Sequence, residues 1–339
     1  MEQRMLGRTG VSVSKLCLGA MMFGAWGNPD HDESIRIVHR ALDAGINFID
    51  TADMYSIGES EEIVGKALKG RRDDVVLATK VHFPLDDEPN HRGNSRRWII
   101  TEVENSLRRL QTDWIDLYQI HRPEPHTDID ETLGALSDLV HQGKIRYFGH
   151  SSFPASEIVE AQWTSERRGR ERFRCEQPSY SMLTRVVEHD VLPTCARYGL
   201  GVISYSPLAG GWLSGRWRKA TGQQASTRAE RLPDRFDLSL PANQRKLDAA
   251  EELALLAEQT GITLIELAIA FVVRHPAVSA AIIGPRTLEH LESQLSAADV
   301  VLSEDVLDRI DQINPAGVSI NHLDNGWVQQ SLGPRARRR

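Results

Sequence analysis

The sequence has few cysteines and no uninterrupted apolar run of membrane-spanning length. Its 339 residues include three cysteines, Cys17, Cys175 and Cys195, and no two of them have CxxC spacing. This odd, small number argues against a disulfide scaffold or a zinc cluster and favours a reducing compartment. The most apolar stretch, residues 263–283, is broken by charged residues and a proline, so it does not predict a membrane span. Since the N-terminus also lacks an apolar targeting segment, we expect a cytoplasmic protein.

The chain also lacks an excess of positive charge and several common motifs. The net charge is −7, so no overall positive field would attract nucleic acid. No GxGxxG follows a strand-like run, and neither HExxH nor an EF-hand loop occurs. We therefore expect neither a Rossmann cofactor site nor a metal site. The absence of GxSxG weakens a serine-hydrolase interpretation.

Short apolar runs alternate with amphipathic stretches along the whole chain. The runs predict strands at residues 15–20, 47–52, 75–80, 115–121, 145–151, 173–178, 201–206 and 279–284. Helical patterns occupy residues 33–44, 60–68, 98–110, 130–141, 154–167, 247–259, 264–274 and 288–296. Most strands lack polar alternation, as expected of parallel strands buried on both faces. Eight βα units without a linker predict an α/β fold, a closed (β/α)8 TIM barrel forming one domain over residues 1–339.

Three segments fall outside this repeat. Residues 4–13 predict an N-terminal β-hairpin that turns at Gly10 and caps the base of the barrel. A long loop, residues 210–243, follows strand seven and is rich in arginine. A C-terminal tail begins at about residue 315, and we expect its arginine-rich end to be disordered.

Polar side chains gather where the predicted strands end. Asp50 ends the second strand, Tyr55 lies in the loop after it, Lys80 ends the third strand and His121 the fourth. The carboxyl ends of barrel strands meet at one face, where barrel enzymes carry their sites. Each residue alone has a structural explanation, but four that converge predict an active site.

These four residue types suit the reduction of a carbonyl group. A tyrosine with its ordinary pKa of about 10 keeps its proton at neutral pH and can act as a general acid. A nearby lysine ammonium eases the release of that proton, and an aspartate would keep the lysine charged. A histidine can orient the carbonyl oxygen, and a nicotinamide would deliver the hydride.

Seven segments, in order, resemble the aldo-keto reductase superfamily. They are GINFIDTADMY at 45–55, VLATK at 76–80, DWIDLYQIHRP at 113–123, GHSSF at 149–153, QPSYS at 177–181, YSPLAGGWLSG at 205–215 and IGPRTL at 283–288. The resemblance covers roughly residues 3–315. It implies an NADP(H)-dependent aldehyde or ketone reductase with Asp50, Tyr55, Lys80 and His121 as its catalytic tetrad.

The resemblance also implies the cofactor contacts. The nicotinamide amide would be held by Ser151, Ser152 and Gln177, and its ring would stack on Tyr205. Arg286 would meet the 2′-phosphate and favour NADPH over NADH, since guanidinium suits phosphate. The complete implied set is Ser151, Ser152, Gln177, Tyr205, Ser206, Pro207, Leu208, Gly210, Gly284, Arg286 and Gln294.

Two positions depart from the family pattern. The family usually has Asn where Ser152 stands, and the serine hydroxyl has a shorter reach toward an amide. The family often has Glu-Asn where Ser293 and Gln294 stand, which leaves the adenine contacts open.

Several interpretations stay open from the sequence. Trp26 and Phe83 either line an apolar pocket for a small-molecule carbonyl substrate or pack at the rim. The loop of residues 210–243 is either a basic lid over the cofactor phosphates or a solvated loop. Trp327 is a candidate cover for the pocket. The oligomeric state is open.

Two other functions are also compatible with these residues. A cofactor-bound regulatory subunit is one, because potassium-channel β subunits resemble aldo-keto reductases. A Schiff-base aldolase with Lys80 as nucleophile is the other, although the motifs on the nicotinamide side argue against it.

Overall fold

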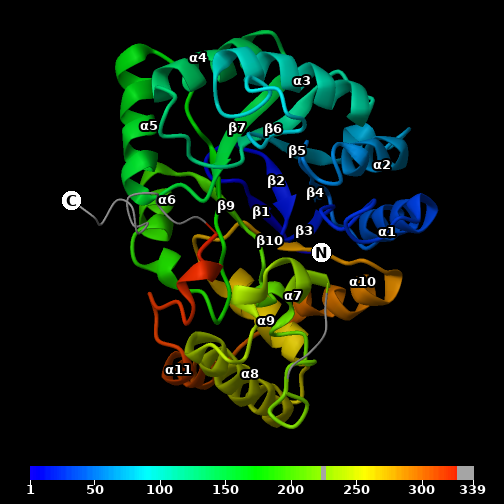
Figure 1. Cartoon of the computed structure of the whole chain (residues 1–339), viewed down its shortest axis with the longest axis vertical. Coiled ribbons are helices and arrows are strands. Elements are labelled where there is room, and N and C mark those ends of the chain that lie inside the picture. The colour runs from blue at the N-terminus through cyan, green and yellow to red at the C-terminus, as the bar shows by residue number, and fades with distance from the viewer. Residues whose placement is uncertain (223–226, 327–339) are drawn as a thin grey trace.

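Eight parallel strands close into a barrel in the computed structural model of the chain, which describes residues 1–222 and 227–326. Sequence neighbours pair in order, and the last strand pairs with the first to close the ring (Figure 1). The barrel strands are β3 Leu16–Gly19, β4 Phe48–Asp50, β5 Val76–Val81, β6 Ile115–Ile120, β7 Ile145–Ser151, β8 Cys175–Gln177, β9 Gly201–Ser204 and β10 Ala280–Ile283. The predicted (β/α)8 barrel is confirmed, and every predicted strand overlaps an observed one.

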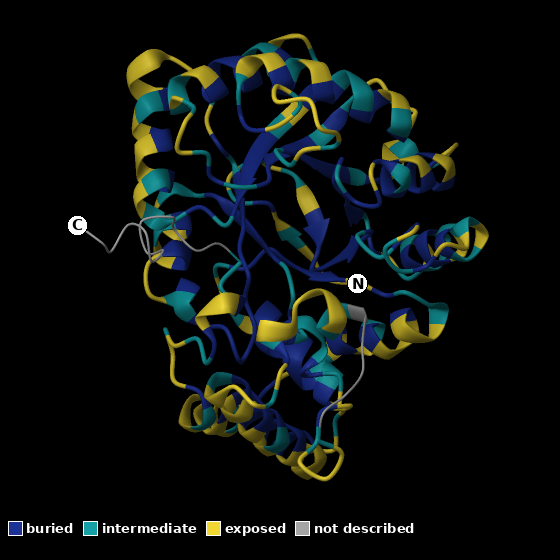
Figure 2. Ribbon diagram, viewed as in Figure 1, coloured by how far each residue is buried: buried dark blue, intermediate teal, exposed yellow. Residues whose placement is uncertain are grey.

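Helices surround the barrel and bury their inner faces against it (Figure 2). The main helices are α1 His31–Asp43, α2 Glu59–Ala67, α3 Arg96–Leu110, α4 Ile129–His141, α5 Ala155–Arg168, α6 Val191–Tyr198, α8 Pro241–Thr260, α9 Leu264–Arg274, α10 Leu288–Leu295 and α11 Glu304–Ile313. Side-chain caps fix several starts, including Asp30 for α1 and Ser95 for α3. Within the described ranges no single helix is long and apolar enough to cross a membrane, whereas α8 and α9 meet that criterion together, as a pair bent by 95°.

The predicted N-terminal hairpin is present and closes the base of the barrel. Strands β1 Gln3–Met5 and β2 Ser12–Ser14 pair antiparallel. Leu6 and Val13 are buried in one cluster with inward-facing barrel residues such as Phe48 and Leu117. Gly7 has a φ of +57°, and a Cβ there would lie 2.3 Å from the Gly201 backbone nitrogen at the start of β9. Only glycine allows this close approach.

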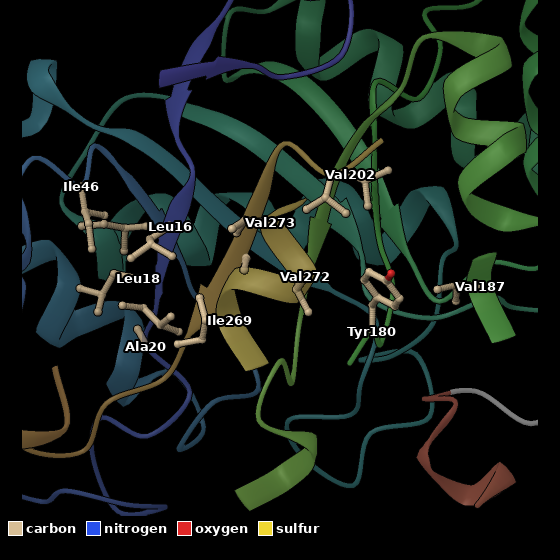
Figure 3. Close-up of a cluster of buried hydrophobic side chains, with 14 of the residues drawn as sticks. Leu16, Leu18, Ala20, Ile46, Tyr180, Val187, Val202, Ile269, Val272 and Val273 are labelled. Carbon is tan, nitrogen blue, oxygen red and sulfur yellow. The ribbon is translucent and has the colours of Figure 1, made fainter. Parts of the chain in front are cut away.

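A second apolar layer lies between the barrel and its helices. In Figure 3, Leu16 and Leu18 of β3 lie in one buried cluster with Ile269 and Val273 of α9. Cys17, between them in the sequence, belongs instead to the cluster inside the barrel. Successive strand residues thus face two apolar environments, which explains why the strand sequences lack polar alternation.

The long loop after β9 has its own structure over its described residues. It contains the short helices α7 Thr227–Arg231 and η4 Pro233–Arg235. Trp212 stacks on Trp217 with ring centroids 4.1 Å apart, and on Phe236 at 5.8 Å. The Nζ of Lys246, on α8, lies 4.7 Å from the Trp212 ring centroid. Trp212, Trp217 and Phe236 are thus buried, but residues 219–221 and 230–234 of the same loop are exposed, so both interpretations of the loop stay open.

The chain after α11 returns to the barrel and ends its described part at Gly326. A short helical turn, η6 His322–Asp324, precedes that end. Trp327 and the arginine-rich end of the tail lie outside the described residues, so the two predictions about them stay predictions.

Candidate active site

The structure brings Asp50, Tyr55, Lys80 and His121 together at the carboxyl ends of β4, β5 and β6. The Lys80 Nζ donates to Asp50 Oδ1 at 2.5 Å, to the Thr51 carbonyl at 2.8 Å and to the Tyr55 hydroxyl at 3.3 Å. The His121 ring meets the Tyr55 ring edge-on, with centroids 5.8 Å apart. A phenol, an ammonium, a carboxylate and an imidazole therefore share one small volume.

Burial sets the protonation states of these groups. Burial raises the pKa of Tyr55 above its ordinary value, although the charge of Lys80 acts in the opposite direction. Burial lowers the pKa of Lys80, but Asp50 and Tyr55 together raise it above the ordinary value. Burial, and then the charges of Arg122 and Lys80, hold the pKa of His121 well below its ordinary range. At neutral pH the site therefore combines a protonated phenol, a charged lysine and a neutral imidazole.

The second oxygen of Asp50 is held by two amides from the barrel interior. Asp50 Oδ2 accepts from Gln119 Nε2 at 3.0 Å and from Gln177 Nε2 at 2.9 Å. Gln177 thus turns its amide nitrogen toward the tetrad and keeps Oε1 as an acceptor. The sequence interpretation missed Gln119, although its position two residues before His121 places both on the same face of β6.

The four residues implied in nicotinamide binding, three for the amide and Tyr205 for the ring, lie together at the ends of β7, β8 and β9. The Ser151 hydroxyl donates to the Gln177 carbonyl at 2.8 Å. The Ser152 hydroxyl and the Tyr205 hydroxyl are 3.1 Å apart. Ser152 has a φ of +60°, in the left-handed region that is costly for most residues. Its N–H is shared between Glu176 Oε1, at 2.9 Å, and the Gln177 carbonyl, at 3.2 Å, and the two bonds together hold this conformation.

The loop implied in pyrophosphate binding follows directly. Ser206, Ala209 and Gly210 all have positive φ angles, of 58°, 49° and 72°. Pro207 and Leu208 lie between them. Tight turns of this kind point backbone N–H groups into a concavity that suits anions.

The predicted phosphate end carries a group of arginines. Burial, and then the neighbouring charges of Arg235, Arg286 and Arg231, lower the pKa of Arg228. Helix α7 thus brings Arg228 into the same electrostatic environment as Arg286. At Gly284 nothing lies within 4 Å of an added Cβ, so the chain there is open. Gln294 is less available, because it is buried and donates Nε2 to the His290 carbonyl at 2.8 Å.

Trp26 and Phe83 flank the tetrad. The Trp26 ring centroid lies 6.2 Å from that of Tyr55, and the Phe83 centroid lies 4.9 Å from that of His121. Their position beside the reactive groups favours the pocket interpretation over rim packing.

The C-terminal segment reaches the same mouth at Gly326, directly before Trp327, the candidate cover, which lies outside the described residues. A Cβ on Gly326 would lie 1.9 Å from the Tyr205 hydroxyl oxygen, so the segment touches the ring implied in nicotinamide stacking. Asp324 fastens it: its Oδ2 accepts from Lys246 Nζ at 2.9 Å and its Oδ1 from Arg235 Nε at 2.6 Å. Lys246 and Asp324 are 78 residues apart, and no local pattern marks such a pair.

Comparisons with known proteins agree with this geometry. The model of the "Aldo/keto reductase family" matches residues 15–315. The "Uncharacterized oxidoreductase YrpG" of Bacillus subtilis is 40% identical, over 93% of this chain and 96% of its own. A "Probable voltage-gated potassium channel subunit beta" of Arabidopsis thaliana is 35% identical, over 92% and 96% of the two chains. The versiconal hemiacetal acetate reductase of Aspergillus parasiticus is 33% identical, over 99% and 100%.

Proposed function

The chain belongs to the aldo/keto reductase family and is an oxidoreductase, and from that premise we propose that it reduces an aldehyde or ketone to the alcohol with NADPH. The observation that carries the proposal is the contact of Lys80 Nζ with both the Tyr55 hydroxyl, at 3.3 Å, and Asp50 Oδ1, at 2.5 Å. This arrangement supplies a protonated acid beside a fixed positive charge.

The residues present fit an NADP(H) molecule. Gln177 Oε1 and the Ser151 and Ser152 hydroxyls would bind the amide, and the turn of residues 206–210 would bind the pyrophosphate. Arg286 and Arg228 would face the phosphates, since neither forms an ion pair with any acidic side chain in the described part of the chain. This fit supports NADPH over NADH, because the cationic end suits the extra phosphate. When bound, the nicotinamide supplies the hydride.

The side chains of the tetrad would orient and protonate the carbonyl oxygen. Neutral His121 can donate one N–H to that oxygen and orient the carbonyl between Trp26 and Phe83. Tyr55 gives its proton to the oxygen as negative charge develops there, and the Lys80 ammonium stabilises the resulting phenolate. Asp50 keeps Lys80 charged and in place.

The decisive experiment is the Tyr55→Phe variant in a panel of carbonyl compounds, followed at 340 nm with NADPH. We expect kcat to fall by about 10²–10⁴-fold, the usual contribution of a positioned general acid. NADPH affinity, measured by fluorescence titration, should stay within a few-fold of wild type because the cofactor residues are intact. Full turnover in this variant would remove Tyr55 from the mechanism.

A second candidate is a cofactor-bound regulatory subunit with little turnover. The observation that favours it is the 35% identity to the protein named as a potassium-channel β subunit. Tight NADPH binding without oxidation of any carbonyl in the panel would support this function and contradict the first.

A further inference from the structure

The aromatic pocket residues and the tetrad form a continuous arc across the mouth of the barrel. Trp26 contacts Tyr55, with ring centroids 6.2 Å apart, and Tyr55 contacts His121 at 5.8 Å. His121 in turn contacts Phe83 at 4.9 Å. The two reactive rings are thus central, and an apolar ring flanks each side. We call Trp26, Tyr55, His121 and Phe83 the aromatic arc.

A guanidinium group lies over each end of this arc. The Cζ of Arg231, on α7, is 4.8 Å from the Trp26 ring centroid. The Cζ of Arg122, directly after β6 and His121, is 5.7 Å from the Phe83 ring centroid. Arg122 also donates to the His121 carbonyl at 2.5 Å and to the Ser151 hydroxyl at 3.3 Å. Stacking on a ring limits the motion of a long side chain, so both charges are held near the reactive groups.

Neither of these arginines pairs with an acidic side chain in the part of the chain that the structure describes. No ion pair joins Arg122 or Arg231 to an Asp or Glu among residues 1–222 and 227–326, whereas Arg109, Arg185 and Arg218 are each paired with two. The charge of Arg122 reaches the reactive groups, since it lowers the pKa of both His121 and Tyr55. Two guanidiniums with donors to spare therefore border the pocket, and guanidinium is the side chain best suited to carboxylates and phosphates.

We propose that the preferred carbonyl substrates carry an anionic group, a carboxylate or a phosphate, separated from the carbonyl by a short apolar spacer. The spacer lies between Trp26 and Phe83, and the anion is bound at one end of the arc, either by Arg122 beside Phe83 or by Arg231 beside Trp26. This inference rests on the proposed function and adds the substrate class to it. Two carboxylates near the arc are already paired: Asp50 with the Lys80 ammonium, and Glu59, which accepts the Ala25 N–H, with His31.

The test compares matched carbonyl pairs at saturating NADPH. The carboxylate pair is 4-carboxybenzaldehyde and 4-methylbenzaldehyde, and the phosphate pair is 4-formylphenyl phosphate and 4-methoxybenzaldehyde. We expect kcat/KM for at least one anionic member to exceed that of its neutral partner by about tenfold or more, the size of one charged hydrogen bond. Which pair shows the preference identifies the anion. The preference should shrink as ionic strength rises, because partly exposed charges are screened.

Two variants assign the effect to the arginines. In either Arg122→Gln or Arg231→Gln, according to the end at which the anion binds, the anionic-to-neutral ratio of kcat/KM should fall by about tenfold, whatever happens to the neutral substrate itself. The matched control is Arg36→Gln, an exposed arginine on α1, in which the ratio should stay at the wild-type value. Because the Arg122 side chain is half-buried, thermal melting is used to check that the Arg122→Gln variant remains folded.

The outcomes separate this inference from the proposed function. Equal kcat/KM for both members of both pairs, or a preference that survives both variants, overturns the inference and leaves carbonyl reduction intact. If no carbonyl oxidises NADPH, the proposed function fails instead. In that case the dissociation constants of 4-carboxybenzyl alcohol and 4-methylbenzyl alcohol, measured by tryptophan fluorescence, decide the anion preference. Equal affinities would then overturn it.

Discussion

His150 and Glu176 form a completely buried pair on the outer face of the barrel wall. They are register partners on β7 and β8, and each directly precedes a residue, Ser151 or Gln177, that faces the proposed amide site. Glu176 uses its other carboxylate oxygen, Oε1, to accept the N–H of Ser152 at 2.9 Å. The family usually has Asn at that position, and Asn tolerates the left-handed backbone better than serine does. The buried pair therefore fixes a conformation that serine alone does not favour.

We expect Glu176→Ala to weaken NADPH binding by about tenfold, because the Ser152 N–H would lose a charged acceptor. The KM for NADPH should rise more than the KM for the carbonyl, since Glu176 acts through the amide site. Glu176→Gln should recover part of the affinity, because its carbonyl oxygen can still accept from Ser152. Glu160→Ala, an exposed position on α5, serves as the control. A general loss of stability with no change in the ratio of the two KM values would contradict this role.

The Lys80–Asp50 contact predicts a non-additive pair of variants. Neither side chain is more than 3% exposed, and removing one member of such a pair leaves a buried charge, at a cost of about 3–5 kcal/mol. Lys80→Met and Asp50→Asn should each lower the free energy of unfolding. The loss in the double variant should be smaller than the sum of the two single losses. Urea denaturation measures this coupling.

Activity should respond differently from stability in the same three variants. The Lys80 ammonium is the charge that lowers the pKa of Tyr55, so its loss leaves the phenol a weaker acid. Both variants that lack Lys80 should therefore have very low kcat, including the stabilised double variant. Recovery of turnover together with stability would show that Lys80 is only structural.

Asp53 predicts an unusual dependence of stability on pH. It has no exposed surface, and its Oδ2 has no hydrogen-bond partner among the described residues. Burial, and then the charges of Glu61 and Glu102, raise its pKa well above the ordinary value, although Arg109 acts in the opposite direction. The folded state thus holds a proton that the unfolded state releases near pH 4, so this group lowers stability as pH rises from about 4 toward its folded pKa.

Replacing Asp53 with a residue that cannot ionise tests the expected fall in stability with rising pH. In Asp53→Asn the Oδ1 acceptor for the Met54 N–H is kept, and the ionisation is lost. The free energy of unfolding of the variant, relative to wild type, should therefore rise between pH 4 and pH 8. Chemical denaturation at a series of pH values measures this difference. A relative stability that falls over this range would show that Asp53 is ionised and stabilised in the folded protein.

The sequence predicted the barrel and the tetrad because both depend on order along the chain. Each strand is a short apolar run, and Asp50, Lys80 and His121 lie at or next to the end of one, so a closed barrel necessarily brings them to one face. Helix α6 was missed because it is short and contains Pro193, and α11 was missed because it lies beyond the eight-fold repeat. Helix α11 nevertheless has a local signal, because the Ser303 side chain caps its start and Glu304 and Asp305 lie in its first turn.

Residues that act through a distant partner could not be predicted. Glu176 is an isolated carboxylate in the sequence, and its role appears only when β8 lies beside β7. Gln119 lies in a mostly apolar strand, and its contact with Asp50 spans 69 positions. Pairing of this kind depends on register and side-chain direction, which hydrophobic periodicity does not specify.

The contact between Lys246 and Asp324 predicts a stability defect that depends on pH. Lys246 is fully buried, and its Nζ donates to Asp324 Oδ2 and to the Arg235 carbonyl. Burial lowers the pKa of Lys246 below its ordinary value, although Asp324 acts against that effect. Asp324→Asn should therefore destabilise the protein at pH 7 by about 3–5 kcal/mol, since an ammonium would remain buried without its counter-charge.

That defect should shrink at alkaline pH. In Asp324→Asn the folded-state pKa of Lys246 falls further, while its unfolded pKa stays near 10.4. Between those two values the unfolded chain binds more protons than the folded one, so this group adds stability as pH rises. The difference between wild type and variant, measured by denaturation from pH 7 to pH 10, should therefore narrow, because the variant can release the lysine proton without unfolding. In Asp324→Asn combined with Lys246→Met no buried ammonium remains, so at pH 7 the difference from wild type should be smaller than it is for Asp324→Asn alone. A gap that is constant in the single variant would mean that Lys246 keeps its proton in the folded state or that solvent reaches it.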